Sequence, residues 1–386
     1  MSEQDTQAVR VLQILFDDRF GGPQKRIFQS IAGLAERGVH VIVALPDRAG
    51  NAHVIAREKG IETRITKMAK IPRPSKIFDV LRWLFTLPGE LLALVRLIRE
   101  VRPDVVTVNG AILVVPALAA KLAGVPVMIN FNDTSLSENL ARLFGWLDRK
   151  LANLIVCQGD GVARHYGLER GQYICVYSAV DIAQFYPRQP IQQRTLRAGL
   201  IANWNPIKDI ENFLEAARQT AQREPSLHFV LAGPKIDTQP EYAERIEHNI
   251  AAAALGDRLT VVGAVQDVPA FMNTLDIVVM CSLREGCPNV VLEAMACGRP
   301  VVATDVGCVR ELLDWEGEPG GIVVPVRDPA RLGDALREIA HDAVRRERLG
   351  NRGRALAQER YSLDAHVACY VTLYREMARR RGLTIL

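Results

Sequence analysis

The segment DIVVMCSLREGCPNVVLEAMACGRPVVAT, residues 276–304, decides how the chain folds. It begins and ends with short continuous apolar runs, DIVVMC at 276–281 and RPVVAT at 299–304, and an Ala-rich stretch lies between them. Neither run alternates apolar with polar residues, as a half-exposed antiparallel strand would, so each fits a parallel strand covered on both faces. The order strand, helix, strand predicts one βαβ unit of a parallel sheet.

Similar apolar runs recur along both halves of the chain, with helical segments between them. The first half contains VRVLQILF at 9–16, VHVIVALP at 39–46, DVVTVNG at 104–110, PVMINF at 126–131 and NLIVCQ at 153–158. The second half adds RAGLIA at 197–202, HFVLAG at 228–233, RLTVVG at 258–263 and GIVVPV at 321–326. Because 386 residues exceed one ordinary core, we predict an α/β protein with two Rossmann-like domains, each a doubly wound parallel sheet.

A polar segment separates the two series of runs. Residues 181–195, DIAQFYPRQPIQQRT, are rich in proline and glutamine and are predicted to link the domains. This places an N-terminal domain at 1–185 and a C-terminal domain at 196–360, and residues 361–386 are expected to form a helix that crosses back to the first domain. Two such domains are expected to face a central cleft at the carboxyl ends of their strands, where α/β proteins bind ligands.

Composition excludes several classes of protein. The chain is 48% hydrophobic and 24% charged, with a net charge of +4, which is too small to favour a nucleic-acid partner. The opening MSEQDTQAVR lacks the pattern of a signal peptide, and no run approaches the roughly 18 apolar residues of a membrane span. The seven cysteines form no C-x-x-C pair, and no histidine pairs with a cysteine at metal-ligand spacing. We expect a cytoplasmic protein with reduced thiols and no metal.

Two carboxylates flank the loop that leads into the Ala-rich stretch. Glu285 and Glu293 are separated by seven residues, and Asn289 can cap a helix that begins near Val290, directly after Pro288. The amides of residues 286–291 are then donors at a helix N-terminus, which favours an anion such as phosphate. Glu293 would reach the hydroxyls of a ribose, and Glu285 a sugar beyond the phosphate. The same spacing also fits two solvated acids, and it does not separate these interpretations.

Residues 285–307, EGCPNVVLEAMACGRPVVATDVG, resemble the E-x7-E signature of retaining glycosyltransferases of family 4, which have the GT-B fold. Further segments resemble that family in the same order. They are FDDRFGGPQKRIF at 16–28, VRPDVVTVNG at 101–110, VYSAVDIAQFYP at 176–187, IANWNPIKDIENFLEAA at 201–217 and FVLAGP at 229–234. The resemblance covers essentially the whole chain and is closest over residues 197–326.

The resemblance implies roles for particular residues. Glu293 would hold the donor ribose, Glu285 the hydroxyls of the donor sugar, and Lys208 the diphosphate. The remaining contacts to the nucleotide sugar would come from Gly21, Gly22, Gly233, Pro234, Gly286, Cys287, Pro288, Asn289 and Val290. For Lys208 the alternative is an ordinary solvated lysine, and for Gly21 and Gly22 it is a tight turn between strand and helix.

Three positions depart from the family pattern. Asn203 stands where the family has an arginine five residues before the lysine, so one cation near the leaving diphosphate is missing. Asn132 replaces a common histidine, and Ser178-Ala179 replaces Asn-Gly. Asn132 and Asn109 can hydrogen-bond sugar hydroxyls, but neither side chain can titrate near neutral pH.

The resemblance implies a metal-independent hexosyltransferase that moves a sugar from a nucleotide diphosphate, UDP above all, to an acceptor hydroxyl with retention. Polysaccharide, lipopolysaccharide or glycolipid synthesis fits such an enzyme, and no cofactor is expected. The departures at Asn203 and Asn132 leave open a non-catalytic nucleotide-sugar-binding homologue that serves a partner enzyme. Release of free sugar and nucleoside diphosphate would favour the transferase, and an isomerised donor would favour an epimerase on the same fold.

The acceptor is expected on the first domain. Residues 67–99 interleave basic side chains with Phe78, Trp83 and Phe85, as a segment that lies on an anionic membrane and meets a lipid-linked acceptor would do. The alternative is that residues 91–98 pack on the sheet while their arginines reach outward to water.

Overall fold

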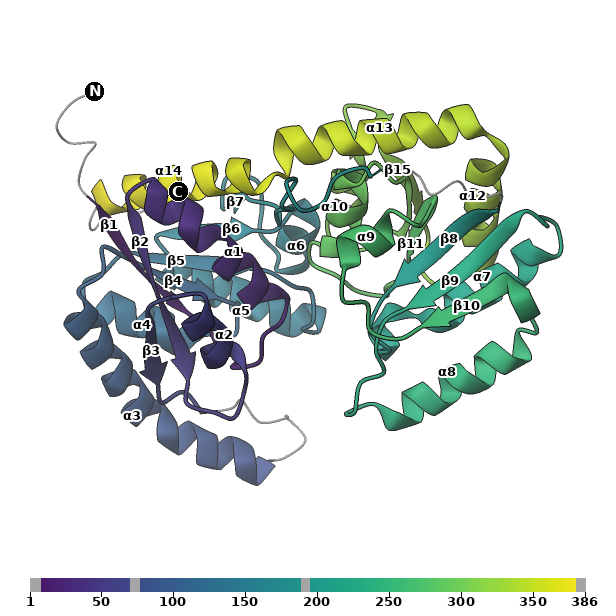
Figure 1. The fold of residues 1–386 in the computed structure, drawn as a ribbon. Coiled ribbons are helices and arrows are strands. Elements are labelled where there is room, and N and C mark those ends of the chain that lie inside the picture. Colours follow the sequence, from purple (N-terminus) through teal and green to yellow (C-terminus); the bar gives the residue numbers. More distant parts are fainter. Residues whose placement is uncertain (1–7, 70–76, 189–194, 380–386) are drawn as a thin grey trace. The chain divides into compact units, whose positions relative to one another are not determined.

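The computed structural model describes residues 8–69, 77–188 and 195–379, which form two compact units (Figure 1). The first unit comprises residues 1–177 together with 363–386, and the second comprises residues 178–362. The division therefore precedes the predicted linker at 181–195. Phe185 is buried, and the backbone N–H of Arg188 donates to Asn273 Oδ1 at 2.8 Å, so these residues pack within the second unit. Residues 189–194 lie outside the described part of the chain.

The first unit is built on a seven-stranded parallel sheet in the order β3-β2-β1-β4-β5-β6-β7. Its strands are β1 (Val9–Ile14), β2 (Val39–Pro46), β3 (Thr63–Thr66), β4 (Val105–Asn109), β5 (Val127–Phe131), β6 (Leu154–Cys157) and β7 (Ile174–Cys175). Its helices are α1 (Gly22–Glu36), α2 (Ala52–Glu58), α3 (Ile77–Val101), α4 (Val114–Leu122), α5 (Glu138–Leu151), α6 (Asp160–His165) and α14 (Leu363–Arg379).

Both faces of this sheet are covered. Leu12 and Ile14 of β1 join a core with α3, α4 and α5, whereas Val9 and Val11 join a second core with α1, α2 and α14. Because successive side chains of a strand point to opposite faces, a continuous apolar run is what a doubly covered strand requires. The C-terminal helix α14 thus completes the core of the first unit, packed beside α1.

The second unit repeats the plan with a six-stranded parallel sheet in the order β10-β9-β8-β11-β12-β15. Its strands are β8 (Leu196–Ile201), β9 (Leu227–Ala232), β10 (Leu259–Val262), β11 (Ile277–Met280), β12 (Val301–Thr304) and β15 (Gly321–Val324), with a small hairpin of β13 (Asp314–Trp315) and β14 (Glu318–Pro319). Its helices are α7 (Ile210–Ala221), α8 (Pro240–Ala252), α9 (Val268–Met272), α10 (Asn289–Ala296), α11 (Val309–Leu313), α12 (Pro329–His341) and α13 (Ala343–Arg360), with short 3-10 turns at Pro206–Lys208 and Gly256–Arg258.

All eleven apolar runs that predicted strands are strands, so the prediction of two doubly wound parallel sheets is confirmed. The sequence analysis missed β3, β7 and the hairpin. TRIT in β3 is largely polar, and β7 and both hairpin strands have only two residues each, so none presents a continuous apolar run.

Each sheet has a point at which the order of its strands reverses. In the first unit β1 and β4 are neighbours there, and in the second unit β8 and β11 are neighbours. The chain leaves the carboxyl ends of two such strands in opposite directions, which opens a crevice where α/β proteins bind ligands. The loop after β8 contains Asn203 and Lys208, and the loop after β11 contains Glu285 and Gly286.

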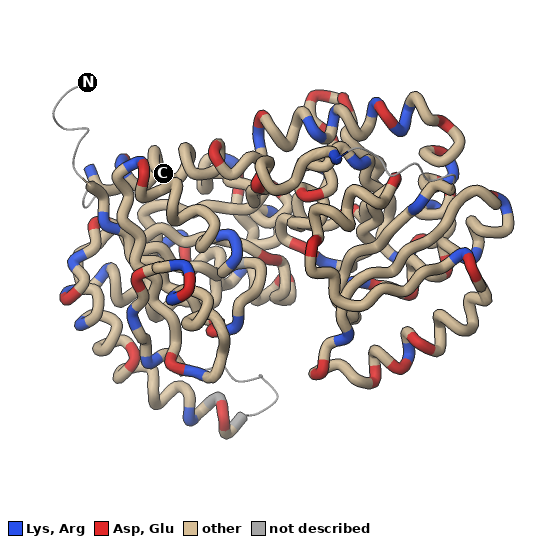
Figure 2. The backbone as a smooth tube through the Cα atoms, viewed as in Figure 1, with Lys and Arg blue, Asp and Glu red and all other residues tan. Residues whose placement is uncertain are grey.

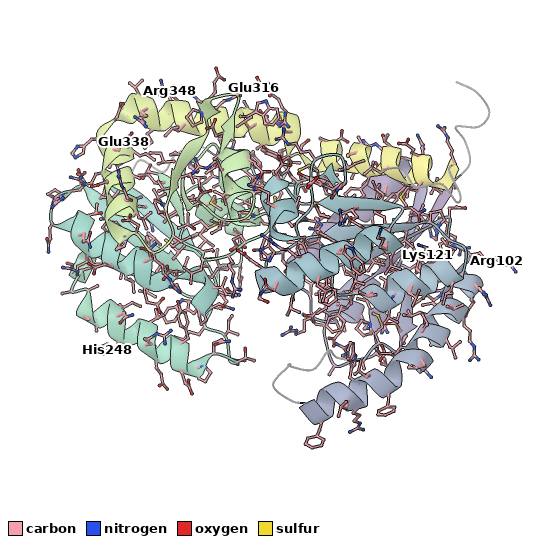
Figure 3. The ribbon with its side chains drawn as sticks, turned by 180° about the vertical axis from the view of Figure 1, so that it is seen from behind. Arg102, Lys121, His248, Glu316, Glu338 and Arg348 are labelled. Carbon is pink, nitrogen blue, oxygen red and sulfur yellow. The ribbon has the colours of Figure 1, made fainter. Side chains whose placement is uncertain are left out.

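Acidic and basic residues are interspersed over both units, without a large field of one sign (Figure 2). The seven cysteines, which all lie in the described ranges, form no disulfide. Side-chain contacts to backbone carbonyls join neighbouring helices. For example, Lys121 of α4, labelled in Figure 3, donates to the carbonyl of Lys150 in α5 at 2.7 Å.

Within the described ranges, no helix combines the length and apolar character that crossing a bilayer requires.

Candidate active site

The loops after β8 and β11 bring Lys208 and Glu285 together. Lys208 Nζ lies 2.6 Å from Glu285 Oε1, although 77 residues separate them in sequence. The backbone N–H of Leu283 also donates to the Ile207 carbonyl at 2.7 Å, so the two loops are joined along the backbone. The Lys208 and Glu285 side chains remain 29% and 17% exposed, respectively, and can therefore reach a ligand. The result is an oriented cation and anion at the reversal point of the sheet.

Lys208 is held at the end of a short turn. Asn205 Oδ1 accepts from the Ile207 N–H at 3.0 Å, and the Asn205 carbonyl accepts from the Lys208 N–H at 2.8 Å. Asp209 follows with φ of 48°, a left-handed conformation that aspartate tolerates better than most residues. This change of direction starts α7 and fixes where the lysine leaves the loop.

Glu285 is oriented by a chain of hydroxyl groups. Ser282 Oγ donates to Glu285 Oε1 at 2.7 Å, and Thr304 Oγ1, at the end of β12, donates to the Ser282 carbonyl at 2.6 Å. Ser282 and Thr304 are both buried. The same carboxylate oxygen therefore accepts from a serine and from Lys208, and these two contacts fix the orientation of the carboxylate.

The loop after β12 supports the backbone beside Glu285. The N–H of Cys308 donates to the Gly286 carbonyl at 3.0 Å, and Gly307 has φ of +55°. A Cβ at Gly307 would lie 2.2 Å from the Gly286 oxygen and 2.4 Å from the Glu285 oxygen. Only glycine permits this approach, so Gly307 determines the path of the loop that carries Glu285.

Helix α10 begins one residue earlier than predicted. Asn289 is its first residue and Pro288 occupies the capping position, where no side chain caps the helix. The prediction of Asn289 as N-cap is therefore wrong, because the fixed φ of proline already supplies the extended residue that precedes a helix. The Val291 N–H donates to the Pro288 carbonyl at 3.2 Å, and the N–H groups of Asn289 and Val290 precede this first hydrogen bond, at the position where a helix N-terminus offers donors to an anion. Glu293 lies one turn into α10 and is half-buried.

Gly233 and Pro234 border the same edge of the sheet. Gly233 has φ of +136°, and a Cβ there would lie 2.0 Å from the Ala202 oxygen, so the loops after β8 and β9 touch. Trp204 is buried beside them, and its backbone N–H donates to the Pro234 carbonyl at 2.9 Å. Asn203 is exposed in this loop. The second unit thus gathers all of its predicted residues at the carboxyl edge of one sheet.

Gly21 and Gly22 lie at the N-terminus of α1, in the first unit. Gly21 precedes the helix in an extended conformation, and neither glycine has a positive φ. A Cβ at Gly22 would meet nothing within 4 Å. The alternative of a tight turn that needs glycine is therefore not what the backbone adopts.

Asn132 and Asn109 differ in their surroundings. Asn132 follows β5, and its Oδ1 atom has no hydrogen-bond partner among the described residues. Asn109 is buried at the end of β4, where it donates to Gln13 Oε1 at 2.7 Å and accepts from Asn130 Nδ2 at 3.0 Å. Asn109 thus takes part in a side-chain network inside the first unit, and its contact with a sugar hydroxyl stays a prediction.

Sequence reasoning missed three residues that shape the site, namely Ser282, Thr304 and Gly307. Ser282 lies three residues before Glu285, the separation at which a side chain in a loop can reach a carboxylate, and this signal was available. Gly307 lies within the segment used for the family resemblance. Thr304 acts only through the pairing of β11 with β12, which a local pattern does not reveal.

The basic segment at 67–99 divides into two parts. In the C-terminal part of α3, Leu94, Val95 and Ile98 are buried, as the alternative of packing on the sheet predicted. In the N-terminal part, Phe78 and Phe85 are 83% and 86% exposed, and Leu81 and Leu84 are also exposed. Residues 70–76 lie outside the described part of the chain. Exposed aromatic side chains therefore exist on the N-terminal part of α3.

The chain has two doubly wound parallel sheets, and the second sheet carries a Lys–Glu pair and a helix N-terminus at its reversal point. These features define an α/β protein of the nucleotide-binding class. Residues 195–342 match the family model described as glycosyl transferases group 1, and residues 21–163 match that of a glycosyl transferase 4-like domain. The chain is 33% identical over 300 residues to alpha-D-kanosaminyltransferase of Streptomyces kanamyceticus, covering 70% of this chain and 75% of that protein. The chain belongs to the group 1 glycosyltransferases.

Two further comparisons agree. The lipopolysaccharide core biosynthesis mannosyltransferase LpsB of Rhizobium meliloti is 28% identical over 155 residues, or 40% of this chain and 44% of that protein. The crystal structure of Anabaena HepE in complex with UDP superposes with a TM-score of 0.81 at 19% identity, covering 95% of this chain and 100% of that one. The predicted GT-B fold and glycosyltransferase family are confirmed.

Proposed function

We propose that this glycosyltransferase moves a hexosyl group from a UDP-sugar to an acceptor hydroxyl, with retention at the anomeric carbon and without a metal or cofactor. The observation that carries the proposal is the Lys208–Glu285 pair, 2.6 Å apart at the reversal point of the second sheet, beside the N-terminus of α10. A cation and helix amides suit a diphosphate, and an oriented carboxylate suits sugar hydroxyls. The site therefore matches both ends of a nucleotide sugar.

In the proposed reaction the bond between the anomeric carbon and the diphosphate oxygen breaks, and negative charge grows on the leaving diphosphate. Lys208 and the first amides of α10 stabilise this charge, which is a term that usually dominates such catalysis. Glu285, held by Ser282, orients the donor sugar, and Glu293 holds the ribose of the nucleotide. The acceptor hydroxyl forms the new bond, and its proton leaves with the diphosphate.

The pairing of Lys208 with Glu285 has a further consequence. A lysine that shares its charge with a carboxylate stabilises the bound diphosphate less than a free lysine does, but it needs no reorientation when charge develops. Asn203, in place of the family arginine, supplies no second cation. In the first unit, Asn132 Oδ1 offers an acceptor for a sugar hydroxyl.

One related protein, named for lipopolysaccharide core biosynthesis, supports a role in the synthesis of a surface glycan. Another is named alpha-D-kanosaminyltransferase, which supports glycosyl transfer without indicating a surface glycan. We propose a saccharide or lipid-linked saccharide as the acceptor, in polysaccharide, lipopolysaccharide or glycolipid synthesis.

The decisive experiment measures donor binding and turnover together. A thermal-shift screen against UDP-, GDP- and ADP-sugars identifies the donor, since a specific ligand raises the unfolding temperature by mass action. With that donor, Lys208→Ala should lower the turnover number far more than donor affinity, and Lys208→Arg should keep part of the activity. If Lys208→Ala turned over the donor as fast as the wild type, the proposed site would be overturned. If the wild type made no product with any donor, a non-catalytic homologue would be favoured.

We also propose that α3 contacts an anionic membrane surface near the acceptor. Phe78 and Phe85 are exposed on its first turns, and the sequence just before the helix carries Lys67, Lys70, Arg73 and Lys76. Co-sedimentation with vesicles that contain anionic lipid tests this contact. Phe78→Ser with Phe85→Ser should abolish binding, whereas Leu92→Ser, at a residue 59% exposed on the same helix, should retain it. Equal binding by both variants would remove α3 from the contact.

A further inference from the structure

Helix α5 exposes a stripe of apolar side chains on its outer side. Ala141 and Gly145 are buried on its inner side, whereas Leu140, Leu143 and Trp146 are 42%, 49% and 51% exposed. Residues three apart in a helix lie on one side at successive turns, so the three exposed side chains form a stripe. Single exposed apolar residues are ordinary, but a stripe that includes tryptophan is typical of an interaction surface.

Basic side chains border this stripe. Arg142, Arg149 and Lys150 are exposed, and none of them forms an ion pair with a residue that the structure describes. Arg149 Nη1 donates to Gln172 Oε1 at 3.1 Å, which is a neutral partner and does not compensate the charge of the arginine. Together with the stripe these residues form the α5 surface: Leu140, Arg142, Leu143, Trp146, Arg149 and Lys150.

Helix α4 adds charge of the same sign. Lys121 is exposed at the end of α4 and donates to the carbonyl of Lys150, so the C-terminal ends of the two helices adjoin. Glu138, at the start of α5, is the exposed acid of these two fully described helices. Cations in the last turn of a helix stabilise it through its dipole, which accounts for Lys121, Arg149 and Lys150. The dipole does not account for Arg142, which lies far from the C-terminal end of α5, or for an exposed tryptophan.

Helices α3, α4 and α5 cover the same face of the first sheet. Leu94 of α3, Ala117 of α4 and Ala141 of α5 belong to one buried core. In Figure 3 this side of the first unit is turned toward the viewer, and the labelled Lys121 marks the end of α4. The α5 surface therefore lies on the side of the unit that carries α3, whereas α1, α2 and α14 cover the other side.

We propose that the α5 surface is a second contact with an anionic membrane, beside the contact of α3 on which this inference rests. Tryptophan and leucine suit the boundary between lipid headgroups and acyl chains, where the indole N–H stays in the polar layer. Lysine and arginine next to them are attracted by the negative potential of anionic lipids. The α5 surface offers both kinds of group, and its basic side chains break no ion pair with a described residue when they meet lipid.

A second contact fixes the orientation of the first unit on the bilayer. One helix tip leaves the unit free to tilt and rotate, whereas two contacts on different helices determine which side faces the lipid. A lipid-linked acceptor is confined to the bilayer and then meets the unit in one orientation, which favours productive encounters.

Charge decides between a membrane and a second copy of the chain as the occupant. In a symmetric pair the same patch of each copy meets itself, so two α5 surfaces would bring basic side chains together. Like charges across an interface cost free energy and disfavour such a pair. An anionic bilayer is complementary to the same side chains.

The test is co-sedimentation of the full-length protein with vesicles of phosphatidylcholine, alone or mixed with phosphatidylglycerol. Wild type should bind the vesicles that contain phosphatidylglycerol. Leu143→Ser with Trp146→Ser should lower the partition coefficient roughly tenfold, because both apolar side chains are then lost from the lipid contact. Arg142→Gln with Lys150→Gln should lower it roughly twenty-five-fold, about fivefold for each charge.

The matched controls lie on α2, on the other side of the first sheet. Val54 is 54% exposed there, and Arg57 and Lys59 are exposed as well. Val54→Ser, and separately Arg57→Gln with Lys59→Gln, should each leave the partition coefficient within about twofold of wild type, because the attraction to lipid charge falls off over a Debye length. All of these variants change exposed side chains, so the unfolding temperature of the lipid-free protein should stay unchanged.

The outcomes separate this inference from the proposed α3 contact. If both α5 variants bind as well as wild type while Phe78→Ser with Phe85→Ser does not bind, the α5 surface is overturned and the α3 contact stands. If wild type does not bind anionic vesicles, both contacts are overturned. An equal loss of binding in the α2 charge variant would also overturn the α5 surface, since attraction would then depend on net charge alone. Sedimentation velocity without lipid gives the last check, because a dimer that dissociates in Leu143→Ser with Trp146→Ser would assign the surface to a second copy.

Discussion

Asp148 is a buried acid whose ionisation should control the stability of the first unit. It lies on α5 with no exposed surface, and neither carboxylate oxygen has a hydrogen-bond partner among the described residues. Burial raises the pKa of this carboxyl from 3.8 to about 8. We predict that Asp148→Asn stabilises the protein, increasingly so as the pH rises from 4 toward 8.

The direction of this pH dependence follows from whether the folded and the unfolded protein bind a proton at Asp148. Below about pH 4 the carboxyl is protonated in both the folded and unfolded states, so it contributes no pH dependence. Between pH 4 and 8 the unfolded chain releases this proton and the folded chain keeps it, so the free energy of unfolding falls as the pH rises. The full difference between the two pKa values corresponds to about 6 kcal/mol at most, reached near pH 8. The asparagine side chain does not ionise in this pH range and has a volume similar to that of aspartate, so the variant lacks this pH dependence.

The assay is urea unfolding of wild type and Asp148→Asn at pH 4, 6 and 8. The difference in the free energy of unfolding should be small at pH 4 and several kcal/mol in favour of the variant at pH 8. Glu138→Gln, which replaces an exposed acid on the same helix, should give a small difference without this rise. A flat difference for Asp148→Asn between pH 5 and 8 would refute the reasoning, because the acid would then be ionised in the folded protein.

Three further predictions concern the donor site. Glu293→Ala should weaken UDP binding by about 1 to 3 kcal/mol in titration calorimetry, since hydrogen bonds to a charged acceptor are the strong ones, and unaltered affinity would remove Glu293 from the ribose. Gly307→Ala should lower both the unfolding temperature and UDP affinity, because its Cβ would lie 2.2 Å from the Gly286 oxygen; normal UDP affinity would show that this loop is not part of the site. Gly22→Ala should leave the unfolding temperature unchanged, since a Cβ there meets nothing within 4 Å, but should reduce turnover; full turnover would exclude Gly22 from donor contact.

Local sequence patterns predicted most strands and the fold class. Eleven continuous apolar runs became eleven strands because a doubly covered strand has to bury side chains on both faces, and that requirement is visible residue by residue. The strand β3 was not predicted in this way because its sequence, TRIT, is largely polar. It is a strand because it pairs with β2, and its own composition does not indicate that pairing. The start of α10 was predicted to within one residue from Pro288 and Asn289.

Sequence alone could identify Lys208 and Glu285 as candidates but could not bring them together. Their distance of 2.6 Å follows from β8 and β11 being neighbours in the sheet, and strand order is a property of the whole domain. For the same reason the sequence alone could not show the surroundings of Asn109. Whether an amide faces a ligand or a neighbouring strand depends on Gln13 and Asn130, which come from other strands of the same sheet.

The sequence by itself determined eleven of the strands of the two parallel sheets, since a strand covered on both faces needs a continuous apolar run of neighbouring residues. Only the tertiary structure decided which polar groups meet. Lys208 pairs with Glu285, Thr304 supports the Ser282 carbonyl, and Gly307 lies against the backbone of Glu285 and Gly286. Each of these contacts joins two different loops of the second unit. Such contacts depend on how parallel strands are ordered and aligned, and the free energy that selects that order comes from the core as a whole.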